Sequence, residues 1–115
     1  MNKIYSLKKN HQIKALLNKK QTVGNKYYIV YYLKNNLEIP LIAISVSKKF
    51  GNAVTRNYYK RVLREILRPE VLSLKGYSFL IVAKTTITSL SFEDKAKELK
   101  FLLGKIIKRS TDEKH

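Results

Sequence analysis

The chain has 115 residues, of which 24 are lysine or arginine and 8 are aspartate or glutamate, so its formal net charge at pH 7 is +16. This length suits a single domain, and a hydrophobic content of 44% excludes a wholly disordered chain. The lack of cysteine excludes disulfides and thiolate chemistry and fits a reducing compartment. A compact domain with this charge repels itself, so we expect a polyanionic partner: nucleic acid first, with an anionic membrane surface as the rival.

The chain shows no sign of a membrane span or a signal peptide. Its longest apolar runs, such as residues 27–33, are far shorter than a bilayer requires. The basic N-terminus is not followed by the apolar segment that a signal peptide needs. We therefore expect a cytoplasmic protein with one domain over residues 1–115, of which residues 109–115 form a frayed tail.

The first half of the chain predicts a helix followed by two strands. A short helix fits residues 10–18, with Asn10 as its N-cap and apolar residues on one face. Residues 25–34 are rich in Tyr, Ile and Val and fit a strand, as do residues 41–47. Both faces of the first strand are apolar, so we expect it to be covered on both sides or to line a groove.

The second half predicts a basic helix, a buried strand and a final helix. Residues 54–68 fit a helix that the following proline terminates, and residues 70–76 then read as a loop. Residues 77–84 fit a buried strand, and the last helix begins near Ser91 with a capping motif. This order predicts an α+β domain with one sheet and helices packed on it.

The helix over residues 54–68 is two-sided on a wheel of about 100° per residue. Its polar sector contains Asn57, Lys60, Arg61, Arg64 and Arg68, and its apolar sector contains Tyr59, Val62, Leu63 and Ile66. Lys48, Lys49 and Arg56 extend the cationic side. The plain alternative is a solvated helix face, but such faces mix charges of both signs, whereas this row is one-signed and repels itself. We therefore expect a phosphate-binding surface.

The sequence contains no recognisable active site. Its two histidines are His11 and His115, which support no Ser/His/Asp or Cys/His arrangement. Asp94 and Glu98 would share a helix face in a metal nuclease, yet acids at the start of a helix are more often structural. We expect a binding protein with no catalytic residue and no metal site of its own.

Residues 45–66, SVSKKFGNAVTRNYYKRVLREI, closely resemble the signature of the bacterial ribonuclease P protein subunit. That family carries Ser-Lys-Lys, a Gly-Asn-Ala-Val turn and a row of the form Arg-Asn-Arg-x-Lys-Arg-x-x-Arg. Length, charge and order of elements match as well, as does the start YSLKKN. The resemblance implies a two-layer α/β sandwich of order α-β-β-β-α-β-α, with a short first strand near residues 21–24 and a left-handed crossover between a strand and the basic helix.

The resemblance also implies a role in a ribonucleoprotein enzyme. In this family a large RNA, with Mg²⁺ held by the RNA and its substrate, hydrolyses precursor tRNA and frees the mature 5′ end. The protein binds ribonuclease P RNA through the basic motif and holds the 5′ leader of precursor tRNA in a cleft between the sheet and the helices. A membrane is not implied, and a protein oligomer is not required.

The family motif carries over residue by residue. Its RNA-binding positions correspond to Lys48, Lys49, Arg56, Asn57, Lys60, Arg61 and Arg64, to which the helical wheel adds Arg68. Tyr58 stands where the family usually has a basic residue, so one RNA contact is lost or replaced by stacking. Ile13 and Leu17 stand where the family commonly has cleft aromatics. Tyr31 resembles a cleft aromatic of the family's strand, with a plain sheet tyrosine as the alternative.

Three other functions remain open at the level of sequence. A ribosomal RNA-binding structural protein would carry the same charge and would co-purify with ribosomal subunits. A stand-alone metal nuclease would cleave RNA without an RNA partner and would depend on Asp94 or Glu98. A peripheral membrane protein would need an exposed apolar helix face, whereas the apolar sides of these helices are needed for the core.

Overall fold

The computed structural model describes residue 18, residues 21–35 and residues 40–113. The helix expected over residues 10–18, with Ile13 and Leu17, lies outside these residues apart from Asn18, which is helical. The described part of the chain forms strands β1 (Thr22–Gly24), β2 (Tyr28–Lys34), β3 (Leu41–Val46) and β4 (Tyr77–Ala83), helices α2 (Ala53–Leu67) and α3 (Phe92–Glu113), and 3-10 turns η1 (Lys48–Phe50), η2 (Arg68–Leu74) and η3 (Thr85–Ser89).

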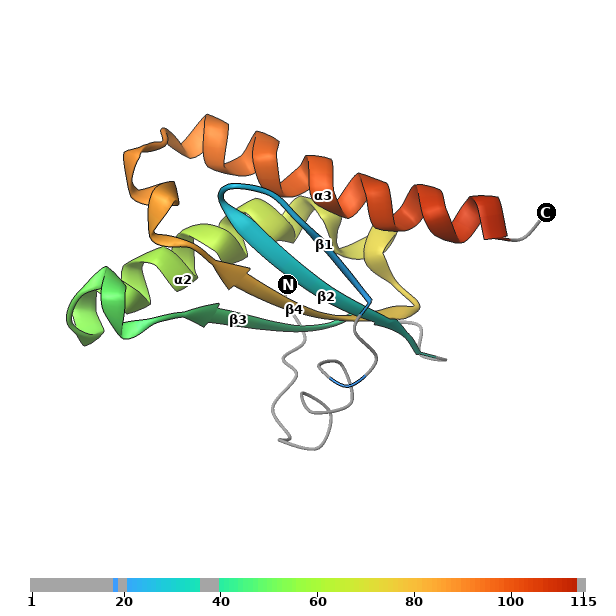
Figure 1. Ribbon diagram of the computed structural model, residues 1–115, viewed down its shortest axis with the longest axis horizontal. Helices are drawn as coiled ribbons and strands as arrows, with labels where there is room; N and C mark the ends of the chain where they lie inside the picture. The colour runs from blue at the N-terminus through green and yellow to red at the C-terminus, as the bar shows by residue number, and fades with distance from the viewer. Residues whose placement is uncertain (1–17, 19–20, 36–39, 114–115) are drawn as a thin grey trace.

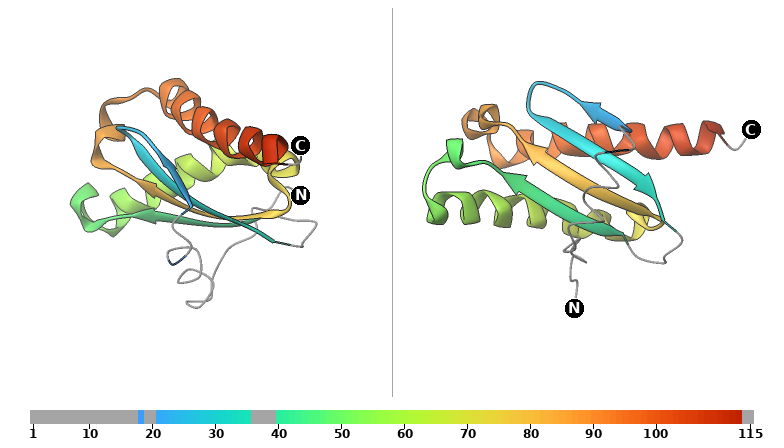
Figure 2. Two further views of the ribbon diagram at one scale, coloured as in Figure 1. Left: turned by 45° about the vertical axis from the view of Figure 1, so that its right-hand side comes forward. Right: turned by 60° about the horizontal axis from the view of Figure 1, so that its bottom comes forward.

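The strands form one mixed sheet in the order β1-β2-β4-β3. β2 pairs antiparallel with β1 and with β4, whereas β3 and β4 are parallel. The parallel strands β3 and β4 are joined through α2, which packs on one face of the sheet. This β3–α2–β4 crossover is left-handed (Figures 1 and 2). Nearly all such connections in proteins are right-handed. The fold class that the family resemblance implied is therefore confirmed for the described elements.

Both long helices cover the same face of the sheet, so the molecule has two layers (Figure 2). Between the layers lies a core of fully buried side chains, among them Tyr28, Phe79, Leu63, Leu67, Leu99, Leu102 and Ile106. α2 packs mainly on β3, while α3 lies over β1 and β2. The periodic apolar stripes of the two helices are thus buried in the core, as the sequence predicted for residues 63 and 66.

Three boundaries differ from the sequence expectations. Residues 70–76 were expected to be a loop, but η2 occupies Arg68–Leu74, because Pro69 suits the first turn of a helix as well as the end of one. β2 begins at Tyr28 instead of residue 25, since the Asn25 side chain accepts hydrogen bonds from the N–H groups of Tyr27 (2.8 Å) and Tyr28 (2.9 Å) and so forms a turn. α3 continues through Glu113, so its helical bounds include residues 109–113 of the segment that was expected to be a tail.

The start of the last helix agrees with its prediction. The backbone N–H of Asp94 donates to the Ser91 hydroxyl oxygen at 3.1 Å, which satisfies one of the free donors of the first turn. Tyr28 ties the same helix to the sheet, because its buried hydroxyl donates to the Lys95 carbonyl at 3.1 Å. Burial, and secondarily the nearby charge of Glu98, raises the pKa of this hydroxyl well above its usual range.

Candidate nucleic-acid interface

The turn that precedes α2 exposes two lysines and sets the residue at which the helix begins. η1 holds Lys48 and Lys49, both exposed, and closes when the Gly51 N–H donates to the Lys48 carbonyl at 3.1 Å. Gly51 has φ 129° and ψ −152°, a backbone conformation that is essentially reserved for glycine. Asn52 follows as the N-cap, and its side-chain oxygen accepts a hydrogen bond from the Thr55 N–H at 3.0 Å. Gly51 and Asn52 therefore set where α2 starts.

The cationic residues predicted from the helical wheel lie on the outer side of α2. Asn57, Arg61 and Arg64 are exposed, whereas Arg56 and Lys60 are half-buried. We call the outward set the α2 stripe; it consists of Lys48, Lys49, Arg56, Asn57, Lys60, Arg61, Arg64 and Arg68. Among the described residues, the cations of the α2 stripe other than Arg68 have no acidic partner within salt-bridge distance. The exposed charges, among them those of Arg61 and Arg64, are therefore available to an anionic partner, whereas the Nε atom of Arg56 is buried without a hydrogen-bond partner in the described part of the chain.

Arg68 differs from the other members of the α2 stripe. It is the residue at the C-terminal end of α2, and its guanidinium lies 3.0 Å from the Glu65 carboxylate. Both side chains are nearly half exposed, at 46% and 48%, so the pair contributes only about 0–1 kcal/mol to stability. The arginine remains accessible, but its charge is partly compensated, so we expect it to contribute less to anion binding than Arg61 or Arg64.

The inner side of α2 holds the stripe in place. Leu63, Ile66 and Leu67 are buried, and Tyr59 and Val62 pack against the same core. The wheel predicted four of these five residues and missed Leu67, which is the last residue of the helix. Because burial of a leucine or isoleucine side chain is worth about 1.5–3 kcal/mol, this inner face can offset the repulsion along the outer one.

An aromatic cluster anchors the first half of α2. The Tyr59 ring centroid lies 5.2 Å from that of Phe50 and 5.2 Å from that of Tyr58, and the Lys95 ammonium lies 5.9 Å from the Tyr59 ring. Lys95 is itself buried and donates to the Leu90 carbonyl. Tyr58 remains 55% exposed beside the cations, so its ring is free to stack on a partner.

The sheet face opposite the helices is apolar and only partly covered in the described part of the chain. Tyr31 lies on it, directly across from Leu80, which in turn lies across from Ala43. Leu80 is buried, while the side chains packed around it are half-buried. These are Tyr31, Leu33, Leu41, Ala43 and Val82. We call this set the sheet patch.

The sheet patch contains residues that the sequence did not single out. Of the residues in the sheet patch, Tyr31 alone was predicted to line a cleft, because Leu41, Ala43, Leu80 and Val82 belong to strands that read as uniformly buried. The alternation of β3 and β4 could have assigned them to one face, but the pairing that brings them beside Tyr31 is not local in sequence. The other two predicted cleft residues, Ile13 and Leu17, lie outside the described residues.

The described carboxylates do not form a cation site. Within residues 18, 21–35 and 40–113, no group of three or more histidine, aspartate and glutamate side chains converges. Glu65 and Glu70 are engaged with Arg68 and Lys100, and Glu98 lies near the Asn25 amide at 3.4 Å. These residues therefore do not fit a Mg²⁺ site. In the same part of the chain, no helix is both long enough and apolar enough to cross a bilayer.

Comparison with known proteins gives consistent results. The family model described as Ribonuclease P matches residues 1–107. The chain is 43% identical over 104 residues to the ribonuclease P protein component of Mesomycoplasma hyopneumoniae strain 7448, covering 86% of this chain and 89% of that protein. It is 36% identical to the component from Carboxydothermus hydrogenoformans, covering 97% and 98%. The solved structure of the Staphylococcus aureus RNase P protein superposes with a TM-score of 0.80 at 29% identity, covering 89% and 94% of the two chains.

Proposed function

The chain belongs to the ribonuclease P protein family, and on this premise we propose that its α2 stripe binds the RNA subunit while its sheet patch holds the 5′ leader of precursor tRNA. The protein is a component of ribonuclease P, an endoribonuclease in which hydrolysis is carried by RNA. A role as a ribosomal structural protein is not favoured. The observation that supports two separate RNA-binding roles is that the charged α2 stripe and the apolar sheet patch lie on different surfaces of the protein.

The α2 stripe is suited to folded RNA because, within the described part of the chain, no acidic side chain neutralises its cations other than Arg68. Arg61 and Arg64 project from a helix whose other side is buried, so they can meet phosphates without unfolding anything. Arginine pairs with phosphate through two parallel hydrogen bonds. Each phosphate contact releases condensed counterions, which makes the binding strongly dependent on salt.

The sheet patch is suited to a single strand. A leader has unpaired bases that can lie against apolar and aromatic side chains, and Tyr31 offers a half-buried ring beside Leu80, around which the sheet patch is packed. Base stacking of this kind tolerates different sequences, which a component acting on many tRNA precursors requires. Tyr58, exposed beside the α2 stripe, offers a second ring in place of the family's usual cation.

We assign the Mg²⁺ to the RNA and the substrate. The described carboxylates do not converge, and the α2 stripe would repel a divalent cation. In this proposal the protein neutralises part of the phosphate charge that the two RNAs bring together, and this lowers the Mg²⁺ concentration required for their association. As part of the same proposal, the protein acts on precursor tRNA in the cytoplasm.

Reconstitution tests this proposal. Precursor tRNA cleavage by a ribonuclease P RNA should require less Mg²⁺ when the protein is added. Arg61→Ala with Arg64→Ala should reverse this effect. Tyr31→Ala should weaken the affinity of the holoenzyme for precursor tRNA but leave its affinity for leaderless mature tRNA unchanged. A cleavage rate that ignores the protein at every Mg²⁺ concentration would refute the role, and equal losses for both tRNA forms would remove the leader from the sheet patch.

A further inference from the structure

The outer side of α3 carries an aromatic ring within a row of lysines. Phe101 is 58% exposed, and the Lys105 ammonium lies 4.6 Å from its ring centroid. Lys97 and Lys108 are exposed as well. At about 100° per residue, these two lysines, Phe101 and Lys105 all lie within a sector about 80° wide on the helical wheel. Glu98 is the acid of this stretch, and it is half-buried and turned toward Asn25. The described structure therefore leaves a ring and several cations together without a charge partner on the helix surface.

Gly104 interrupts this row in the middle of the helix. It is exposed, and a Cβ added there would meet nothing within 4 Å. Glycine weakens a helix interior relative to alanine, and here neither packing nor backbone conformation requires it. A bare backbone does allow another molecule to approach the helix closely, between Phe101 on one side and Lys100 on the other.

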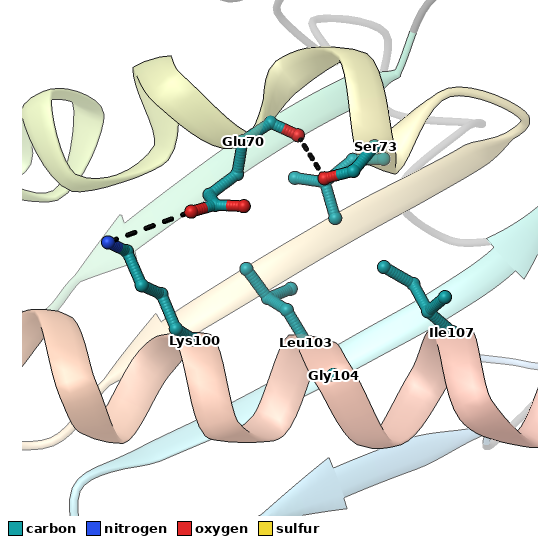
Figure 3. A pocket seen from close by; sticks show the side chains of 7 residues that line it. Glu70, Ser73, Lys100, Leu103, Gly104 and Ile107 are labelled. Carbon is teal, nitrogen blue, oxygen red and sulfur yellow. Dashed lines mark hydrogen bonds and ion pairs between the residues drawn. The ribbon is translucent and has the colours of Figure 1, made fainter.

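A shallow pocket of about 90 Å³ opens beside Gly104, between α3 and η2. Figure 3 shows Leu103 and Ile107 reaching from α3 toward η2, while Lys100 extends to Glu70 at 3.6 Å. The base of the pocket is thus apolar and its rim is charged. Both side chains of the ion pair are partly exposed, so the lysine can exchange its partner at little cost.

We propose that this surface, the α3 face, binds a single-stranded RNA segment at a place separate from the α2 stripe. The α3 face consists of Lys97, Lys100, Phe101, Gly104, Lys105 and Lys108. A base stacks on Phe101, the lysines contact the neighbouring phosphates, and the strand crosses the helix at Gly104. Charge complementarity selects this occupant, because a second copy of a chain with a net charge of +16 would be repelled.

Fluorescence anisotropy with a labelled, unstructured 12-nucleotide RNA tests the α3 face. The full-length chain should first carry Arg61→Ala, Arg64→Ala and Tyr31→Ala, so that the α2 stripe and the sheet patch contribute less. In this background, Phe101→Ala should weaken binding about 5- to 150-fold, the range for loss of one stacked base. Phe101→Tyr should retain the affinity. Lys105→Ala should reduce the salt slope by about 0.7, the value for one phosphate of a single strand.

Phe92→Ala is the matched control. Phe92 is an exposed phenylalanine of the same helix, at 52%, but its neighbours are Glu93 and Asp94. Its removal should leave the affinity within about twofold. The proposal fails if Phe92→Ala and Phe101→Ala have equal effects, or if neither has any. It also fails if Phe101→Ala abolishes a dimer in sedimentation, or binding to phosphatidylglycerol vesicles, without altering RNA affinity. None of these outcomes bears on Arg61 and Arg64 in the holoenzyme.

Discussion

Removing two charges from the α2 stripe separates its binding role from its structural role. Arg61 and Arg64 are exposed and have no salt bridge within the described part of the chain. Alanine at both positions favours the helix and removes a repulsion between neighbours three residues apart. We therefore expect the free energy of unfolding of Arg61→Ala/Arg64→Ala to stay within about 0.5 kcal/mol of the original value.

The effect on RNA binding should be large and should depend on salt. For double-stranded DNA, each phosphate contact steepens the slope of log K against log salt by about 0.9. If the duplex parts of the RNA behave in the same way, two contacts contribute about 1.8. Between 50 and 200 mM salt, a fourfold change, the original protein should then lose about tenfold more affinity for ribonuclease P RNA than the variant does. Filter binding or anisotropy across this salt range measures both slopes.

A matched control removes the same charge from elsewhere. Lys26 and Lys75 are exposed and lie outside both the α2 stripe and the α3 face. Lys26→Ala/Lys75→Ala should leave the salt slope nearly unchanged. If the two double variants reduce the slope equally, the effect reflects net charge alone and the assigned face is wrong. Leu63→Ala, on the inner side of the same helix, should instead destabilise the fold by about 2–5 kcal/mol.

Three further predictions concern the elements that position the interface. Asn52→Ala should cost about 0.5–2 kcal/mol in urea unfolding, because the Thr55 N–H loses its acceptor, and an unchanged midpoint would show that the cap is dispensable. Gly51→Ala should cost about 1–3 kcal/mol in the same assay because of its φ of 129°. Gly104→Ala should instead stabilise α3 by about 0.8–1 kcal/mol, because alanine favours a helix interior over glycine. If both substitutions changed the free energy of unfolding in the same direction, the backbone argument would be wrong. The raised pKa of Tyr28 means that the folded state retains a proton that the unfolded state releases above about pH 10, so stability should fall as pH rises past that value. Tyr28→Phe should flatten this part of the pH profile, and a profile identical in both proteins would exclude the buried hydroxyl as its cause.

The sequence by itself determined the two-sided character of the basic helix and the order of the elements. Helical periodicity is local, so residues 57, 61 and 64 share a side whatever the rest of the chain does. The Gly-Asn turn likewise has a local cause, since Gly51 adopts a positive φ and the Asn52 side chain caps the helix that follows. The long mixed motif that contains them was specific enough to indicate the family.

Only the tertiary structure decided which distant residues meet. The order β1-β2-β4-β3 places Tyr31 across from Leu80 and Leu80 across from Ala43, and no local pattern specifies these pairings. The pocket beside Gly104 likewise depended on how η2 docks on α3. The physical reason is common to both: local periodicity follows from backbone geometry, whereas sheet order and helix docking follow from burial summed over segments far apart in the chain.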